Sequence, residues 1–305
     1  MSDKYNVPYY HPRFWPTWLM LSLLWLCSKL PFNWQISIGK GLGLLLMKLA
    51  KRRTHIAKVN LALCFPELTD KQQQEMLREV FIQQGVGLIE MAQVWWPREH
   101  ALKGRCTING LEHYQQAAAQ GKGVLLMGGH YSVLELGAWF LGKEMTLDGM
   151  YRANNNPILQ AIGIKGRSRF FETAIERRDI RLLIKQLKRG KTVWYAPDQD
   201  FGTKNTVFAP FFGVPAATLT ASARIVQMTK VPVLMVSQHR NPDNTYRIDI
   251  HPPLTNFPTG DDEVDATRLN AELEAIVRTE PTQYVWVHRR FKTQPDGKDL
   301  YANKA

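Results

Sequence analysis

Along residues 104–290, short apolar runs alternate with segments whose apolar residues recur at helical spacing. The apolar runs predict buried strands, and one alternating run predicts a half-exposed strand. These strands cover residues 123–127, 192–196, 231–236 and 246–250. The helical segments cover residues 110–120, 179–189, 220–229 and 265–278. Strands alternating with helices are typical of an α/β fold with a largely parallel sheet, in which ligands bind at the carboxyl ends of the strands.

A longer helix is predicted before this region. Thr69 and Gln72 have the spacing of a capping box, in which each side chain bonds to the backbone amide of the other residue. Apolar residues then follow helical spacing to about Trp95, so we expect one long helix between these points.

An N-terminal apolar segment runs without a charge from Phe14 to Ser28, between Arg13 and Lys29. A second apolar stretch covers residues 36–47. Three alternatives fit the first segment: a signal peptide, a buried core helix or a membrane anchor. No small-residue cleavage site follows it, which argues against the signal peptide. The segment is also shorter than the ~20 residues of a comfortable helical span.

The flanks of these two segments favour the anchor. Trp15, Trp18 and Trp34 are of the type found at membrane interfaces. Basic residues follow the second stretch: Lys48, Lys51, Arg52, Arg53 and Lys58. This order favours a cytoplasmic position for the body of the chain. We therefore expect residues 1–53 to form a short span or a tilted interfacial insertion with its basic flank. Residues 54–305 are expected to form an α/β domain that faces the cytoplasm.

The net charge of +12 fits several classes of partner. Nucleic acid, an anionic membrane and an acidic substrate or carrier are compatible with it, and so is a solvated basic surface. The three cysteines lie far apart in the sequence, which argues against a disulfide framework or a zinc site and fits a reducing compartment. The eight histidines show no metal-binding spacing such as H-E-x-x-H. We therefore expect no cofactor and no metal.

The clearest candidate for chemistry follows the strand at residues 123–127, which leads through two glycines to His130. Glu135 comes five residues later, and Ser132 is a candidate N-cap for a helix whose first turn would bring Glu135 back to the imidazole. A neutral histidine removes a proton from an alcohol, and a carboxylate on its other nitrogen fixes the tautomer. No G-x-S-x-G elbow supplies a nucleophile. The acceptor hydroxyl is therefore the expected nucleophile, without an acyl-enzyme; the alternative is a structural histidine.

The block Gly-Gly-His-Tyr-Ser-Val-Leu-Glu-Leu-Gly around His130 resembles the H-x4-D/E block of the bacterial lipid A late acyltransferases, which are relatives of the glycerolipid acyltransferases. Further blocks of that family have counterparts here in the same order. They begin at His11, Asn60, Tyr151, Trp194 and Tyr284. The resemblance extends from about residue 11 to about residue 293. Such an ordered series is a specific signal, whereas one block alone would not be.

The resemblance implies an α/β fold like that of the glycerolipid acyltransferases and an enzyme with His130 as general base and Glu135 as its partner. Leu-Glu-Leu-Gly and His-Arg-Arg-Phe-Lys-Thr are closer to the lauroyl and palmitoleoyl branch than to the myristoyl branch. In that branch the donor is an acyl carrier protein thioester and the acceptor is Kdo2-lipid IVA. The implied location is the bacterial inner membrane. Nucleic acid is not an expected partner.

Further candidates for substrate binding come from the other family blocks and from the basic middle of the chain. They are Arg152, Asn155, Arg167, Asp198, Asp200, Arg289 and Arg290. An arginine such as Arg152 holds a phosphate or carboxylate by a bidentate contact, or caps a turn. Asp198 and Asp200 would position the attacking hydroxyl or a basic partner, although Asx turns after Pro197 fit them as well. The apolar block at residues 208–214 would line an acyl channel or belong to the core.

Rival functions are distinguished by motifs and by the acceptor. A glycerol phosphate acyltransferase shares H-x4-D/E but usually carries an F-P-E-G-x-R-S block, which this sequence lacks. An acyl thioesterase would use water in place of the alcohol. A basic nucleic-acid-binding protein has little support, because the sequence contains no helix-turn-helix, RNP block or zinc knuckle.

Overall fold

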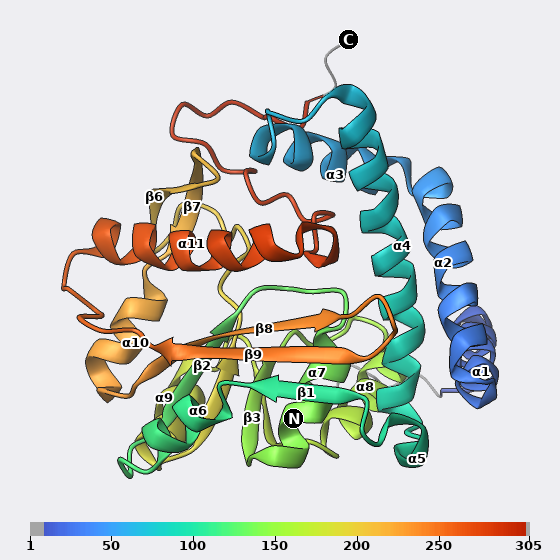
Figure 1. The fold of residues 1–305 in the computed structure, drawn as a ribbon, viewed down its shortest axis with the longest axis horizontal. Helices are drawn as coiled ribbons and strands as arrows, with labels where there is room; N and C mark the ends of the chain where they lie inside the picture. Colours follow the sequence, from blue (N-terminus) through green and yellow to red (C-terminus); the bar gives the residue numbers. More distant parts are fainter. Residues whose placement is uncertain (1–8, 303–305) are drawn as a thin grey trace.

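The structure is a computed structural model that describes residues 9–302 (Figure 1). Its N-terminal part is helical and contains η1 (Pro12–Phe14), α1 (Trp15–Lys29), α2 (Phe32–Leu49), α3 (Lys51–Cys64) and α4 (Asp70–Trp95). The strands that follow are β1 (Cys106–Asn109), β2 (Val124–Gly128), β3 (Leu147–Tyr151), β4 (Phe171–Glu176), β5 (Thr192–Tyr195), β6 (Thr206–Phe211), β7 (Val214–Leu219), β8 (Val233–Arg240) and β9 (Tyr246–Pro253). The remaining helices are α5 (Glu99–Leu102), α6 (Leu111–Ala118), α7 (Leu134–Glu144), α8 (Pro157–Arg167), α9 (Ile180–Lys188), α10 (Ala221–Thr229), α11 (Asp262–Thr279) and η2 (Pro281–Gln283).

The main sheet has the strand order β1-β9-β8-β2-β5-β3-β4. Its neighbouring strands are parallel except for β8 and β9, which are antiparallel. The central strand β2 is apolar and fully buried, as expected for a strand covered on both faces. The predicted α/β fold with a largely parallel sheet is therefore confirmed.

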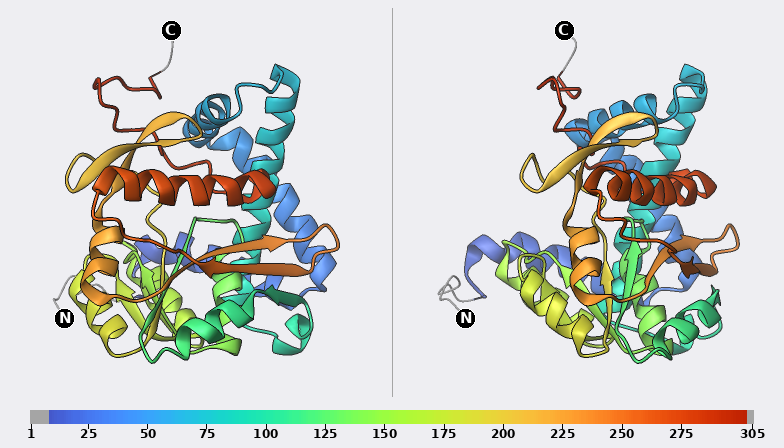
Figure 2. Two further views of the ribbon diagram at one scale, coloured as in Figure 1. Left: turned by 60° about the vertical axis from the view of Figure 1, so that its left-hand side comes forward. Right: turned by 90° about the vertical axis from the view of Figure 1, so that its left-hand side faces the viewer.

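Helices cover the sheet, and further elements, including α11, lie above it in the view of Figure 1. In Figure 1 and in both views of Figure 2, α11 lies between the main sheet and the antiparallel β6–β7 hairpin. The long helix α4 runs beside the sheet, and α2 lies along α4. The C-terminal segment returns to the helical part, where the side chain of Asn60 donates hydrogen bonds to the carbonyl oxygens of Trp286 and His288.

The predicted long elements are confirmed. Helices α4, α6, α9, α10 and α11 and strands β2, β5, β8 and β9 lie where the pattern of apolar residues places them. The capping box is present as well: Thr69 accepts a hydrogen bond from the Gln72 amide, and Gln72 accepts one from the Thr69 amide. Within the block at residues 208–214, Phe211 and Phe212 belong to the core, whereas Phe208 is 39% exposed.

Glycines allow α2 and α4 to approach closely. A Cβ on Gly85 of α4 would lie 2.3 Å from the carbonyl oxygen of Gly39 and from the backbone nitrogen of Gly43, both on α2. Real Cβ atoms do not approach backbone atoms this closely, so the two helices can pack at this distance only without that side chain. The N-terminal helices are thus fixed to the rest of the fold through α4.

The N-terminal helices do not span a membrane in the part of the chain that the structure describes: no helix there is both long and apolar enough. The core-helix alternative fails for α1, in which only Leu21 and Ser28 are buried. Large apolar side chains of α1 are exposed instead: Trp15, Trp18, Leu19, Met20, Leu23, Trp25 and Leu26. The division of the chain at residue 53 stays a prediction.

Candidate active site

His130 lies two residues beyond the end of β2, at the carboxyl edge of the sheet. A Cβ on Gly128 would lie 2.6 Å from the carbonyl oxygen of Val236, so the glycine lets β8 approach this strand end. The C-terminal segment holds His130 from the other side, because the amide of Val285 donates a hydrogen bond to the His130 carbonyl oxygen at 2.9 Å. The histidine therefore has a fixed backbone at the point where a parallel sheet binds its ligands.

The His130 imidazole is bonded to Asp198, which lies just beyond β5, the neighbour of β2 in the sheet. Nδ1 of His130 lies 2.5 Å from Oδ1 of Asp198. The His130 amide donates to Oδ2 at 2.8 Å, and the Tyr284 hydroxyl donates to the same oxygen at 2.9 Å. The imidazole remains 29% exposed, whereas the Asp198 side chain is 2% exposed. A buried carboxylate thus holds a histidine whose other nitrogen, Nε2, is left to accept a proton.

The protonation states follow from burial and mutual attraction. Burial lowers the pKa of His130, but the charge of Asp198 and the hydrogen bond with it raise the pKa more, so the net shift is upward. Burial raises the pKa of Asp198, and the attraction of His130 with the three hydrogen bonds outweighs it, bringing this pKa to about 2. Burial and the nearby carboxylate hold the pKa of Tyr284 well above its ordinary value, so this hydroxyl stays a neutral donor.

A pocket of about 630 Å³ opens beside His130. This volume lies within the ~300–1,000 Å³ of small-molecule sites. Much of its wall is apolar and comes from Leu134, Ala138, Met150, Phe171, Ile180, Trp194, Ala196, Phe201, Leu219 and Ala221. Four arginines also line it: Arg152, Arg167, Arg177 and Arg178. The pocket therefore offers one surface to an apolar chain and another to anionic groups.

Glu135 lines the same pocket but contacts a different partner from the one expected. It lies in the first turn of α7, as predicted, yet its carboxylate accepts hydrogen bonds from the Arg167 guanidinium. The expected contact with the imidazole is wrong, because Asp198 already occupies Nδ1 of His130. Ser132 is not the N-cap either: α7 begins after Val133, which makes no side-chain cap. The catalytic role of Glu135 itself stays a prediction.

Comparison with known proteins decides the class of this site. The sequence model of the family described as bacterial lipid A biosynthesis acyltransferase matches residues 3–293. The chain belongs to this family. It is therefore an acyltransferase, and the resemblance read from the sequence blocks is confirmed.

Relatives of this acyltransferase include three from Escherichia coli. It is 37% identical to the lipid A biosynthesis lauroyltransferase, over 96% of this chain and 97% of the relative. It is 35% identical to the lipid A biosynthesis palmitoleoyltransferase, over 97% of each chain. Identity to the myristoyltransferase of the same organism is 26%, over 99% of this chain and 96% of that one. The similarity is thus greater to the lauroyl and palmitoleoyl enzymes, as the sequence blocks indicated.

A solved structure, the 1-acyl-sn-glycerophosphate acyltransferase from Thermotoga maritima, aligns with a TM-score of 0.37 at 14% identity. The alignment covers 78% of this acyltransferase and 98% of the other chain.

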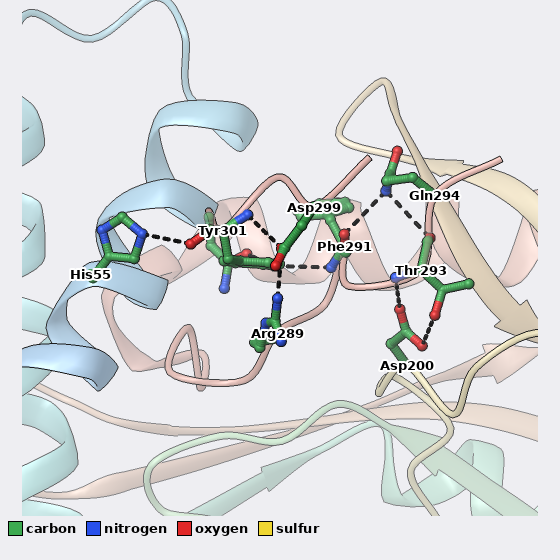
Figure 3. Close-up of polar contacts among 9 residues, drawn as sticks. His55, Asp200, Arg289, Phe291, Thr293, Gln294, Asp299 and Tyr301 are labelled. Atoms are coloured by element: carbon green, nitrogen blue, oxygen red, sulfur yellow. Dashed lines mark hydrogen bonds and ion pairs between the residues drawn. The ribbon is translucent and has the colours of Figure 1, made fainter. Parts of the chain in front are cut away.

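The remaining predicted site residues of the acyltransferase fall into two groups. Arg152 and Arg167 line the pocket. Asp200 instead accepts hydrogen bonds from the amide and the hydroxyl of Thr293 (Figure 3). It also accepts one from the Gly202 amide, which is the Asx turn that the sequence allowed as an alternative. Arg289 pairs with Asp299 in the C-terminal segment, away from the pocket lining.

Arg290 and Asn155 do not line that pocket either, but Arg290 lines a smaller cavity together with His130 and Asp198. Arg290 is buried at 3% exposure and donates to the Ala217 carbonyl oxygen, the Thr218 hydroxyl and the Asn270 side chain. Asn155 is exposed, next to the residue that caps α8. The structure therefore gives Asp200, Arg289 and Arg290 contacts that hold the C-terminal segment, and their role in substrate binding stays a prediction.

Several site residues were not singled out from the sequence. Tyr284 bonds to Asp198, and the ring of His288 lies 5.8 Å from that of His130. Burial and the neighbouring His130 lower the pKa of His288 to about 4, so this second imidazole is neutral. Both residues stand in the C-terminal family block, which was the available signal. Within residues 9–302, no cluster of His, Cys, Asp and Glu has the arrangement of a metal site.

Proposed function

We propose that this acyltransferase transfers a fatty acyl chain, lauroyl or similar, from an acyl carrier protein thioester to a hydroxyl of Kdo2-lipid IVA. The observation that supports the proposal most strongly is a histidine with a free Nε2 beside a large pocket that is part apolar and part arginine-lined. The names of the lauroyl and palmitoleoyl relatives support the choice of a lipid A-type acceptor.

The proposed reaction starts with His130 as general base. Nε2 removes the proton of the acceptor hydroxyl while the oxygen attacks the thioester carbonyl carbon. The tetrahedral intermediate then collapses, the carbon–sulfur bond breaks, and the imidazolium returns the proton to the leaving thiolate. The products are an ester and the free thiol of the carrier. Direct attack is favoured because none of the described residues that line the pocket is Ser, Thr or Cys, so no serine or threonine hydroxyl and no cysteine thiol is at hand there to form an acyl-enzyme.

The two surfaces of the pocket suit the two parts of the substrates. The apolar wall, which includes Met150, Phe171 and Trp194, would shield an acyl chain from water. Arg152, Arg177 and Arg178 would bind phosphate groups of the acceptor, because guanidinium groups form bidentate hydrogen bonds with phosphate oxygens. An acidic carrier protein would also be attracted to this rim, and the net charge of +12 favours the encounter.

The exposed apolar side of α1 supports a location at a membrane surface. Trp15, Leu19 and Leu26 are 64%, 63% and 54% exposed, and the basic residues at 48–53 are solvent-exposed nearby in sequence. A tilted insertion at the interface would bury these apolar groups and bring the basic ones to anionic lipid headgroups. We propose that the enzyme lies on the bacterial inner membrane, with its catalytic domain facing the cytoplasm.

An acceptor comparison tests the proposal. Detergent-solubilised enzyme is supplied with a lauroyl-acyl carrier protein and either Kdo2-lipid IVA, lysophosphatidic acid, glycerol 3-phosphate or no acceptor. We expect a product heavier by one acyl chain with Kdo2-lipid IVA. Acylation of a glycerol phosphate in its place would favour the glycerolipid rival. Release of free fatty acid at the same rate with and without an acceptor would favour a thioesterase.

A further inference from the structure

Two carboxylates of the pocket region compete for the role of partner to His130, and they come from different parts of the chain. Glu135 is five positions from His130 and Asp198 is 68 positions away. Only Asp198 touches the imidazole, with Oδ1 at 2.5 Å from Nδ1. We propose that Asp198, rather than Glu135, is the positioning residue that fixes the tautomer of His130 and stabilises its protonated form. This inference rests on the proposed role of His130 as base.

The position of Asp198 is set by the sheet. Strands β2 and β5 are parallel neighbours, with Met127 opposite Tyr195, so their carboxyl ends meet at one edge. The residues just beyond those ends are therefore brought side by side, although they are distant in the sequence. Both the ring and the backbone of His130 are bonded to the one carboxylate, which leaves the imidazole little freedom to rotate.

Asp198 is itself held in place. Its two oxygens receive hydrogen bonds from the His130 ring, the His130 amide and the Tyr284 hydroxyl, and the side chain is 2% exposed. A second hydrogen-bonding shell of this kind orients a catalytic group and prevents the carboxylate from swinging toward solvent. The donor Tyr284 comes from the C-terminal segment, which pairs with Tyr131 through a β-bridge. The arrangement therefore joins β2, β5 and the C-terminal segment in one unit.

The carboxylate of Glu135 is paired with Arg167 instead of with His130. Nε of Arg167 lies 3.0 Å and 3.3 Å from its two oxygens, and Nη2 of Arg167 donates to it as well. The Arg167 guanidinium also lies 5.5 Å from the centre of the Tyr151 ring. To reach the imidazole, Glu135 would have to give up its bidentate ion pair with Arg167. Nδ1 of His130 could not accept it as a partner, because Asp198 is already bonded there. Its carboxylate therefore belongs to the pocket wall rather than to the base.

The chemical consequence resembles that of a serine protease triad without the serine. A proton on Nδ1 is shared with Asp198, so Nε2 carries the lone pair that removes the substrate proton. Asp198 stays ionised throughout, because its pKa is about 2. When the imidazole becomes positively charged, the adjacent negative charge stabilises it. Removing that charge while keeping the shape of the side chain should therefore reduce turnover far more than substrate binding.

The test compares Asp198→Asn with Glu135→Gln, and uses the exposed Asp296→Asn and Glu172→Gln as matched controls. The first readout is the pKa of the His130 ring, which is measured by ¹⁵N NMR of histidine-labelled enzyme without substrate. The His130 signal is assigned as the one that is lost in His130→Ala. The second is kcat and KM for acyl transfer across pH. We expect Asp198→Asn to lower the His130 pKa and to reduce kcat roughly 10²–10⁴-fold with a small change in KM. Asp198→Glu should restore part of both.

The outcomes separate this inference from the proposed function. A lowered His130 pKa in Glu135→Gln, with no change in Asp198→Asn, would assign the partnership to Glu135 and overturn the inference. If Asp198→Asn fails to fold, Glu135→Gln still decides: an unchanged His130 pKa supports Asp198, and a lowered one contradicts it. If the wild type transfers an acyl chain to no acceptor, the proposed function is overturned. The NMR result on the partner of His130 does not depend on that activity and would still hold.

Discussion

The carboxylate of Glu135 is bound by the guanidinium of Arg167, with Nε at 3.0 Å and 3.3 Å from its two oxygens. The pair joins α7 to the end of α8 across the wall of the pocket, and both side chains are about one-fifth exposed. The acidic member of the H-x4-E motif is thus a fixed feature of the substrate pocket, a few residues from the base but not bonded to it.

Removal of Arg167 should show how much this ion pair contributes to the free energy of unfolding. Arg167→Ala leaves a partly buried carboxylate without its partner, and we expect a loss of about 1–3 kcal/mol in the free energy of unfolding, below the cost for a fully buried pair. Arg167→Lys should recover only part of it, because an ammonium cannot form the bidentate contact. Chemical denaturation measures the stability. Lys165→Ala, at an exposed position of the same helix, is the control and should change little. Equal stability of Arg167→Ala and Lys165→Ala would contradict this account.

The rate of transfer should rise with pH through the pKa of His130. The base must be unprotonated to act, and Asp198 raises the imidazole pKa above its ordinary value of 6.5 despite the opposing effect of burial. The midpoint of the profile of kcat/KM is therefore expected above pH 6.5. In Asp198→Asn the raising effect is lost while burial remains, so the midpoint should move to lower pH. A profile that is unchanged in this variant would count against His130 as the titrating base.

The packing of α2 against α4 gives a stability prediction with a built-in control. Gly85→Ala places a Cβ 2.3 Å from backbone atoms of α2, so the helices must separate, at a cost of about 1–3 kcal/mol. Gly41→Ala adds a methyl group on α2 with no atom within 4 Å, and the better helix propensity of alanine should stabilise it by about 0.5–1 kcal/mol. Thermal unfolding of the two variants should therefore shift in opposite directions; a shift in the same direction would show that the close approach is not as described.

Membrane binding should depend on the exposed side of α1. Leu19→Glu introduces a charge where the proposed insertion buries an apolar group, so co-sedimentation with vesicles of phosphatidylglycerol and phosphatidylethanolamine should fall. Val264→Glu, at a comparably exposed apolar position on α11, is the control and should bind as the wild type does. If the two variants bind vesicles equally, α1 is not the membrane contact.

The long elements were predictable because their signal is local. An apolar run or a helical period over ten or more residues is independent of distant contacts, and α4, α9 and α11 follow it closely. Strand β8 shows the limit. The pattern ends it at residue 236, but the strand continues through Ser237, Gln238, His239 and Arg240, which are polar and buried. Strand β1 has only four residues and, unlike the equally short β5, contains no continuous apolar run that would mark it.

The candidate site was predictable to the extent that its residues are close in sequence or share a family block. His130 was found at a strand end, and Arg152 and Arg167 do line the pocket. The partner of His130 was assigned to Glu135, since spacing arguments favour near neighbours. The actual partner, Asp198, is brought there by strand order, which no local pattern contains. Likewise, charge alone could not separate Arg167, which lines the pocket, from Arg290, whose two terminal nitrogens donate buried hydrogen bonds.

The most direct test of the central claim is the mass of the lipid product made by the wild type and by His130→Gln from lauroyl-acyl carrier protein and Kdo2-lipid IVA. Far-UV circular dichroism would first establish that both proteins are folded. Since a positioned base contributes roughly 10²–10⁴-fold to such a step, we predict a product heavier by one acyl chain from the wild type and its near absence from the variant. Product formed by the folded variant at the wild-type rate would contradict the account.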